Sequence, residues 1–263
     1  MTLARLEDLG DRLVVTATNG ARRNALTPEY YAVLAEALDR AAAPRVAAVI
    51  LRGSDGYFCA GGDLSRLAER RDLPRSERLA RVEELHDLIR AVMACPVPVI
   101  AAVEGGAAGA GASLAFACDL VVADRGATFT AAYVKAGLTP DGGLTANLAR
   151  LLPRTMAMRM TLLGEAVTAT RLHDLGVVCR IAPAGGVFDA AMDLADRLAA
   201  GPGRAQRRIK ALVNAAGEGD VAAQLDRERD AIADALAGAE AAEGIDAFLS
   251  KRPADFAALR GRE

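Results

Sequence analysis

Two glycine-rich segments have the composition of loops that bring backbone N–H groups close to a bound molecule. They are residues 58–64 (FCAGGDL) and 105–111 (GGAAGAG). Glycine has no side chain, so another molecule can approach the backbone closely. The second segment also leads into a predicted helix, whose N-terminus leaves unpaired N–H groups at its positive end. Two such loops directed at one point predict an oxyanion hole, a pocket that stabilises a negatively charged oxygen.

Other types of glycine loop fit less well. A dinucleotide-binding loop needs glycines in the order G-x-G-x-x-G, whereas Gly106, Gly109 and Gly111 have the reverse spacing. The chain also lacks the Gly-Lys-Ser/Thr ending of a phosphate-binding loop. Taken alone, each segment is equally consistent with tight turns and close packing of a helix on a sheet.

The elements that flank these segments alternate between strand and helix. Strands are predicted at residues 13–18, 46–51, 97–103, 120–123, 128–130 and 177–181. A helix is expected to begin at Thr27 and Pro28, another to bury Leu79, Val82 and Leu85, and a third to follow Gly105 as far as Ala117. This alternation predicts a largely parallel sheet and an α/β fold, with a mostly helical region after about residue 147.

The composition is that of an ordinary globular protein. The chain has 263 residues, of which 52% are hydrophobic and 25% charged, and its formal net charge is -2. This balance disfavours disorder, nucleic-acid binding and a polybasic membrane surface. Two histidines and four widely spaced cysteines provide little material for a zinc site. The first residues lack a secretion signal, and we expect a soluble, cytoplasmic protein.

The order of motifs along the chain resembles the crotonase superfamily, the enoyl-CoA hydratase/isomerase family. The matching segments are residues 24–26 (NAL), 58–64, 102–111 (AVEGGAAGAG), 117–119 (ACD), 137–143 (GLTPDGG), 162–164 (LLG), 175–178 (LGVV) and 248–253 (FLSKRP). They span nearly the whole chain in the family's order, which is far more specific than any single motif.

The resemblance implies a β-β-α spiral core over residues 1–195 and a helical trimerisation subdomain over residues 196–263. It implies an acyl-CoA thioester as substrate, coenzyme A being part of that substrate, with no separate cofactor and no metal. The expected assembly is a homotrimer or a dimer of trimers. The backbone N–H groups of Gly62 and Ala110 would form the oxyanion hole. Relatives often have glycine at the second position, and alanine keeps the donor where its φ is negative.

The chain departs from the family's hydratases where they place two glutamates. The corresponding residues here are Ser113 and Tyr133. Addition of water to a double bond needs a base that activates water and an acid that protonates carbon. A serine hydroxyl and a phenol of ordinary pKa about 10 are poor substitutes. Ordinary hydration is therefore not expected.

Asp141, in residues 140–143 (PDGG), is the remaining acid in a suggestive position. Enoyl-CoA isomerases and the ring-epoxide isomerases of phenylacetate breakdown have an acidic residue at this loop position. By local sequence alone, Pro-Asp-Gly favours a turn in which the aspartate bonds its own backbone. Within the resemblance, Asp141 becomes the acid and base of double-bond migration, in an apolar pocket that would raise its basicity. The residues expected to form that pocket are Phe129, Tyr133, Leu138 and Leu144.

The resemblance also implies a set of substrate-binding positions. These are Arg23, Ala25, Ala60, Gly61, Asp63, Leu64, Ser65, Ser113, Tyr133 and Lys251. Asp63 is expected to shape its loop more than to do chemistry, and Lys251 to contact coenzyme A phosphate, across a subunit boundary if necessary. His86 and His173 are not expected to be catalytic.

Several alternatives remain open. The same enolate chemistry would serve ring-epoxide isomerisation, hydration or thioester hydrolysis. A non-catalytic protein that binds acyl-CoA would keep the pocket without the reaction. A serine protease or esterase is a distant alternative, because Ser54 and Ser113 lack the G-x-S-x-G motif.

Overall fold

The computed structural model describes residues 2–217 and 219–261, and it confirms the predicted α/β fold. A six-stranded sheet has the order β1-β2-β3-β4-β6-β9, and a three-stranded sheet has the order β5-β7-β8. The strands are β1 (Ala4–Asp8), β2 (Arg12–Ala17), β3 (Ala48–Gly53), β4 (Val99–Val103), β5 (Gly106–Ala108), β6 (Leu120–Asp124), β7 (Thr128–Thr130), β8 (Ala166–Thr168) and β9 (Arg180–Ala182). The β1–β2 and β7–β8 pairs are antiparallel, and the other pairs are parallel.

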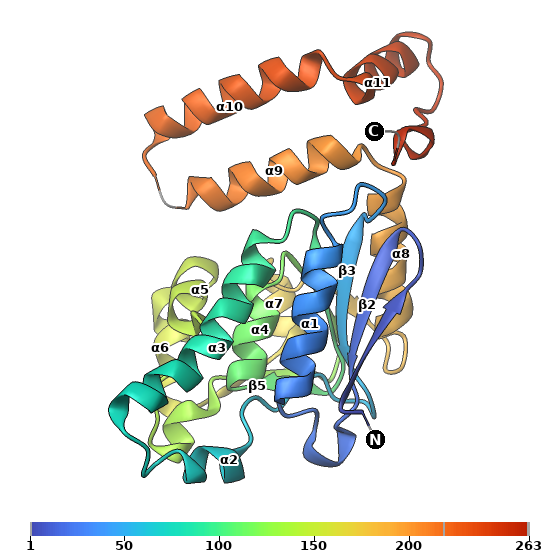
Figure 1. Cartoon of the computed structure of the whole chain (residues 1–263). Helices are drawn as coiled ribbons and strands as arrows, with labels where there is room; N and C mark the ends of the chain where they lie inside the picture. Colours follow the sequence, from blue (N-terminus) through green and yellow to red (C-terminus); the bar gives the residue numbers. More distant parts are fainter. Residues whose placement is uncertain (1, 218, 262–263) are drawn as a thin grey trace.

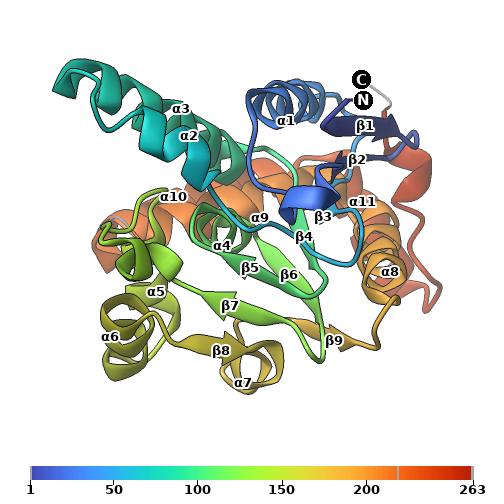
Figure 2. The ribbon, with the colours of Figure 1, turned by 90° about the horizontal axis from the view of Figure 1, so that it is seen from below.

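Helices cover both faces of the larger sheet (Figures 1 and 2). They are α1 (Pro28–Arg40), α2 (Leu64–Glu69), α3 (Arg75–Ala94), α4 (Ala110–Ala117), α5 (Leu144–Leu151), α6 (Arg154–Leu163), α7 (Ala169–Asp174), α8 (Val187–Ala199), α9 (Gly203–Ala216), α10 (Val221–Leu236) and α11 (Ala239–Leu249). The expected start of α1 is confirmed: Thr27 caps the helix by accepting a hydrogen bond from the N–H of Tyr30 at 3.2 Å.

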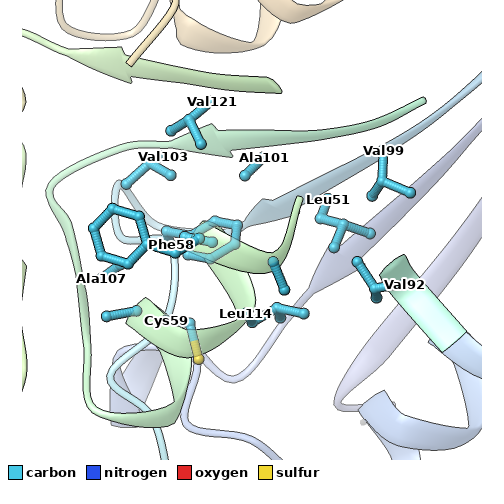
Figure 3. Packing of buried hydrophobic residues seen from close by; sticks show 14 of the residues in the cluster. Leu51, Phe58, Cys59, Val92, Val99, Ala101, Val103, Ala107, Leu114 and Val121 are labelled. Atoms are coloured by element: carbon cyan, nitrogen blue, oxygen red, sulfur yellow. The ribbon is translucent and has the colours of Figure 1, made fainter. Parts of the chain in front are cut away.

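Alternate residues of the central strands divide the core into two layers. One set, which includes Val49 and Val99, packs against α1, α3 and α4, and the other, which includes Ile50 and Ile100, packs against α8. Figure 3 shows Phe58 and Cys59 among the first set. These two residues belong to the first glycine segment. That segment is therefore anchored in the core before it reaches the surface.

The last helices extend from the core (Figure 1). An ion pair attaches α9: the buried Lys210 ammonium lies 2.6 Å from the Asp119 carboxylate and donates to the Val97 carbonyl at 3.1 Å. Beyond α9, helix α10 packs on α9, and α11 packs on α10. Within residues 2–217 and 219–261, no helix combines the length and the hydropathy needed to span a membrane.

Two expectations about individual elements are wrong. Residues 106–108, which were expected to be helical, form strand β5, because they pair with β7 before α4 begins. Leu79 and Val82 are 51% and 36% exposed, whereas Leu85 of the same helix is buried. The first turns of α3 extend away from the sheet, so they have no core to pack against (Figure 2). Strands β1 and β8 carried no clear sequence pattern.

Candidate active site

The two glycine segments lie side by side because they follow adjacent parallel strands. Strands β3 and β4 are hydrogen-bonded neighbours, and their carboxyl ends lie at the same edge of the sheet. Cys59 of the first segment pairs with Ala107 of the second, and the Ala108 N–H donates to the Cys59 carbonyl at 2.9 Å. The first segment thus pairs with β5 of the smaller sheet, and this pairing fixes the separation of the two loops.

The contact between the segments leaves no space for a side chain at Gly61. Its φ is +88°, and a Cβ there would lie 2.6 Å from the Ala108 carbonyl oxygen and 2.8 Å from the Ala110 nitrogen. A Cβ on Gly111 would lie 2.3 Å from the Cys59 carbonyl oxygen. Glycine at these positions brings the two backbones into direct contact.

Free N–H groups gather where the segments meet. Gly109 turns the chain into α4 with φ 52°, and its carbonyl accepts from the N–H groups of Ala112 and Ser113 at 2.9 and 3.1 Å. Ala110 is the first residue of α4, so its N–H has no partner within the helix. Among the hydrogen bonds of the described residues, none uses the N–H of Gly62 or Ala110. These two donors are available to an anionic oxygen at the positive end of α4.

Asn24 holds the first segment from the outer side. Its side chain is 1% exposed and donates to the carbonyls of Ser54 and Tyr57 at 2.8 and 2.6 Å. Two residues later, the Leu26 N–H donates to the Gly61 carbonyl at 2.8 Å. The loop before α1 therefore fixes the peptide whose N–H belongs to Gly62.

Asp141 lies on a third loop, which contacts α4 through Ser113, and its carboxylate is hydrogen-bonded to a phenol. The Tyr133 hydroxyl donates to Oδ1 of Asp141 at 2.6 Å, and the Ser113 Oγ lies 3.0 Å from the Tyr133 Oη. Asp141 is half-buried, and Ser113 is fully buried. The aspartate does not make the simple turn contact with its own backbone that its local sequence favours.

Helix α4 connects the aspartate to the oxyanion donors. Ser113 lies one turn after Ala110, and its hydroxyl is within hydrogen-bond distance of the Asp141 carbonyl, at 3.0 Å. A Cβ on Gly142 would lie 2.8 Å from the Ser113 Cβ, so this loop packs directly on the helix. The same short helix thus presents an N–H donor at its start and holds the carboxylate loop one turn later.

The charge of the Asp141 carboxylate contributes to a raised pKa in two phenols, Tyr133 and Tyr31. Burial, together with the charge and hydrogen bond of Asp141, raises the pKa of Tyr133 well above its ordinary value. Burial and, secondarily, the Asp141 charge raise the pKa of Tyr31 to about 12. Both groups therefore stay protonated at neutral pH. Sequence reasoning missed Tyr31, which is about 100° round α1 from the buried Tyr30 and packs partly buried against the core.

Most of the remaining predicted substrate-binding residues lie in or near the first glycine segment, whereas Lys251 lies far from it. Asp63 caps α2 by accepting from the Ser65 N–H at 2.9 Å, and it forms an ion pair with Arg22, so its side chain shapes the loop. Arg23, Leu64 and Ser65 are exposed beside it, whereas Ala25 is buried and Ala60 is half-buried. Lys251 follows α11, at the end of the molecule opposite α2 (Figure 1). One chain therefore does not bring Lys251 to the loops, and its contact across a subunit boundary stays a prediction.

The expected apolar pocket around Asp141 is wrong in part. Leu138 is 46% exposed, because the turn at Gly137 directs it outward. Phe129 and Leu144 are buried in the core. Tyr133 is the member of this set that touches the carboxylate, through a hydrogen bond.

Comparison with known proteins gives a consistent result over the whole chain. A family model described as enoyl-CoA hydratase/isomerase matches residues 13–259. A 1,2-epoxyphenylacetyl-CoA isomerase of Escherichia coli (strain K12) is 36% identical over 246 residues, which are 93% of this chain and 94% of that protein. A probable enoyl-CoA hydratase of Rhodobacter capsulatus is 36% identical over 92% of this chain and 90% of its own length.

Solved structures agree with the sequence comparison. The crystal structure of an enoyl-CoA hydratase from Polaromonas sp. JS666 superposes with a TM-score of 0.92 and 43% identity, over 95% of this chain and 98% of that one. A crystal structure of a putative enoyl-CoA hydratase from Streptomyces coelicolor has a TM-score of 0.92 and 34% identity, over 98% and 94% of the two chains.

Proposed function

Because the chain belongs to the enoyl-CoA hydratase/isomerase family, we propose that it moves a double bond along the acyl chain of a coenzyme A thioester. The observation that carries this proposal is the position of the Asp141 carboxylate. Its loop is hydrogen-bonded to Ser113 of α4, the helix that also provides an oxyanion donor at Ala110. Migration of a double bond needs one group that removes a proton and returns it elsewhere, and this geometry offers one such group.

The reaction proceeds through an enolate. The Asp141 carboxylate removes a proton from one carbon of the acyl chain and becomes a carboxylic acid. The released electron pair moves toward the thioester carbonyl, and the N–H groups of Gly62 and Ala110 stabilise the negative charge on its oxygen. Asp141 then returns the proton two carbons away, where the electron pair closes the new C–H bond. One oxyanion donor contributes about 2.7–4 kcal/mol in comparable sites.

The hydrogen bonds of Ser113 and Tyr133 disfavour hydration as the reaction of this site. These residues stand where the family's hydratases have glutamates, and both are hydrogen-bonded to the Asp141 loop. Neither is free to activate a water molecule, and Tyr133 stays protonated because burial raises its pKa. Ser113 and Tyr133 therefore bring no second carboxylate to the Asp141 loop.

Ring-epoxide isomerisation is the second candidate. A relative that is 36% identical carries the name 1,2-epoxyphenylacetyl-CoA isomerase. Such a reaction would use the same thioester carbonyl and the same donors, so a panel of substrates distinguishes it from double-bond migration better than a mutation does.

We further propose that the working form is a homotrimer or a dimer of trimers. Apolar side chains on the last helices are exposed in the single chain: Val213 is 67%, Val221 76% and Phe248 83% exposed. Burial of such a face between copies would remove it from water. Sedimentation velocity on the purified protein tests this, and a monomer at micromolar concentration would contradict it.

The test of function uses 2-enoyl-, 3-enoyl- and cyclic epoxide thioesters of coenzyme A. We expect double-bond migration with the wild type and a loss of about 10²–10⁴-fold in kcat for Asp141→Asn, with thioester affinity retained. Asp39→Asn, an exposed carboxylate on α1, is the matched control and should keep wild-type activity. Robust hydration by the wild type, or tight binding of every thioester without turnover, would contradict the proposal.

A further inference from the structure

Two oxygens of Asp141 and the hydroxyl oxygens of Tyr133 and Ser113 form a closed set of three contacts. The Tyr133 Oη lies 2.6 Å from Oδ1 of Asp141, the Ser113 Oγ lies 3.0 Å from the Tyr133 Oη, and the same Oγ lies 3.0 Å from the Asp141 carbonyl oxygen. The set begins and ends on Asp141. It joins the side chain of this residue to its backbone through two hydroxyl groups that come from different elements.

The hydroxyl groups of Tyr133 and Ser113 can keep their contacts in both protonation states of Asp141. When the carboxylate is charged, two hydroxyl protons serve three contacts, and Tyr133 donates to Oδ1. When Asp141 takes a proton from the substrate, that proton is on Oδ2; Oδ1 is still an acceptor, so Tyr133 continues to donate to it and Ser113 can donate to the Asp141 carbonyl. Both hydroxyls can rotate without moving their oxygens, so one arrangement of heavy atoms suits both states.

We propose that Tyr133 and Ser113 are positioning residues that hold Asp141 in one place through both protonation states of its catalytic cycle. The inference rests on the proposed function, because it assigns Asp141 the role of proton carrier. Tyr133 occupies Oδ1 and leaves Oδ2 to meet the substrate. Ser113 fixes the peptide that carries the side chain. A base that removes a proton at one carbon and returns it at another benefits from such a fixed position, since misplacement lowers the rate of both transfers.

The surroundings suit a donor that keeps its proton. Tyr133 lies in the 3₁₀ turn Ala132–Ala136, is partly buried, and remains protonated because burial and the Asp141 charge raise its pKa. Ser113 is fully buried on α4, where Gly142 packs against its Cβ. The Ser113 hydroxyl also lies 3.4 Å from the Gly109 carbonyl oxygen, a longer contact than the 3.0 Å to the Asp141 carbonyl.

The experiment removes one hydroxyl at a time. Tyr133→Phe should lower kcat for double-bond migration by roughly 10- to 100-fold, the range expected for loss of a hydrogen bond to a charged group, with KM within about twofold of the wild type. Ser113→Ala should lower kcat by a smaller factor. If the two hydroxyls act as one set, Ser113→Ala should cost less in the Tyr133→Phe background than alone.

Tyr30→Phe is the matched control. Tyr30 is a buried phenol of the core whose raised pKa comes from burial and not from Asp141, so the same substitution there should leave kcat unchanged. Melting temperatures of all the variants show whether each is folded.

Two outcomes would overturn the inference: a kcat of wild-type size for Tyr133→Phe, or strictly additive effects of the two substitutions. Failure of the proposed function is distinguishable, because the wild type would then show no double-bond migration, or Asp141→Asn would keep it, whatever Tyr133→Phe does.

Discussion

The two sides of the proposed active site, an oxyanion side and an acid–base side, use different parts of the chain. On the oxyanion side, the donors are backbone N–H groups of Gly62 and Ala110, and the glycines matter for the space that they leave. On the acid–base side, the carboxylate of Asp141 is held by the hydroxyls of Tyr133 and Ser113. The first side depends on conformation and the second on side-chain identity.

This difference separates the substitutions that each side tolerates. A residue on the oxyanion side can change where the new side chain has room and φ permits it, because the donor belongs to every residue except proline. A residue on the acid–base side cannot change without loss of a specific proton donor or acceptor. Substitutions that add or remove a single Cβ therefore test the first side, and pH tests the second.

Among the substitutions on the oxyanion side, the largest expected effect comes from Gly61→Ala. The new Cβ would lie 2.8 Å from the Ala110 nitrogen, so the two loops must separate, and φ +88° is unfavourable for alanine. We expect kcat to fall by about 10²–10³-fold, the loss seen when one oxyanion donor is removed. Gly56→Ala is the control, because Gly56 has φ +70° but no atom within 4 Å of the new Cβ. An equal loss in both variants would mean that backbone strain and not the contact is responsible.

At alkaline pH, the free energy of unfolding should depend on whether residue 133 has a phenol hydroxyl. Its pKa is raised in the folded state, so above the ordinary value of about 10 the unfolded chain loses this proton first, and stability falls as pH rises. Buried thiols add to the decline, since burial also raises the pKa of Cys59 to about 12. Between about pH 10 and 11, urea titration should show a fall in the free energy of unfolding that is smaller for Tyr133→Phe than for the wild type by roughly 1 kcal/mol. Parallel curves would contradict this.

The smallest expected effect comes from Ala110→Gly. The N–H donor remains, and the variant loses a methyl group that is 6% exposed. Glycine costs roughly 0.5–1 kcal/mol relative to alanine in a helix, so kcat should change by less than about fivefold. A steady-state comparison with the wild type checks this. A loss as large as that of Gly61→Ala would show that the alanine side chain itself contributes to the hole.

The sequence predicted the meeting of the two glycine segments better than the contacts of Asp141, for a physical reason. Residues 46–51 and 97–103 are apolar runs of strand length, each followed by glycines, and adjacent parallel strands bring such loops to one edge. The short strand β5 was missed because Gly106, Ala107 and Ala108 have no β-branched or aromatic side chain. Pairing with β7, which is distant in sequence, determines its structure.

The contacts of Asp141 were beyond the reach of local patterns. Ser113 and Asp141 are 28 residues apart and meet only because α4 and the loop before α5 pack together. The sequence identified both residues, but it described Ser113 and Tyr133 as poor replacements for glutamates. Their contacts with Asp141 are a property of the tertiary structure, and no spacing in the chain encodes a distance of 2.6 Å between a phenol and a carboxylate.

The packing of Gly142 on Ser113 sets a limit for redesign. With Ser113 fully buried and the Gly142 backbone directly above it, a glutamate at position 113 has no volume to occupy. It would lift the loop from α4 and bring a second negative charge toward Asp141, which like-charge repulsion opposes. A single exchange at position 113 therefore cannot convert this site to water chemistry. Because Gly142 is already the smallest residue, only a change in the course of its loop, made together with the helix position, would create that volume.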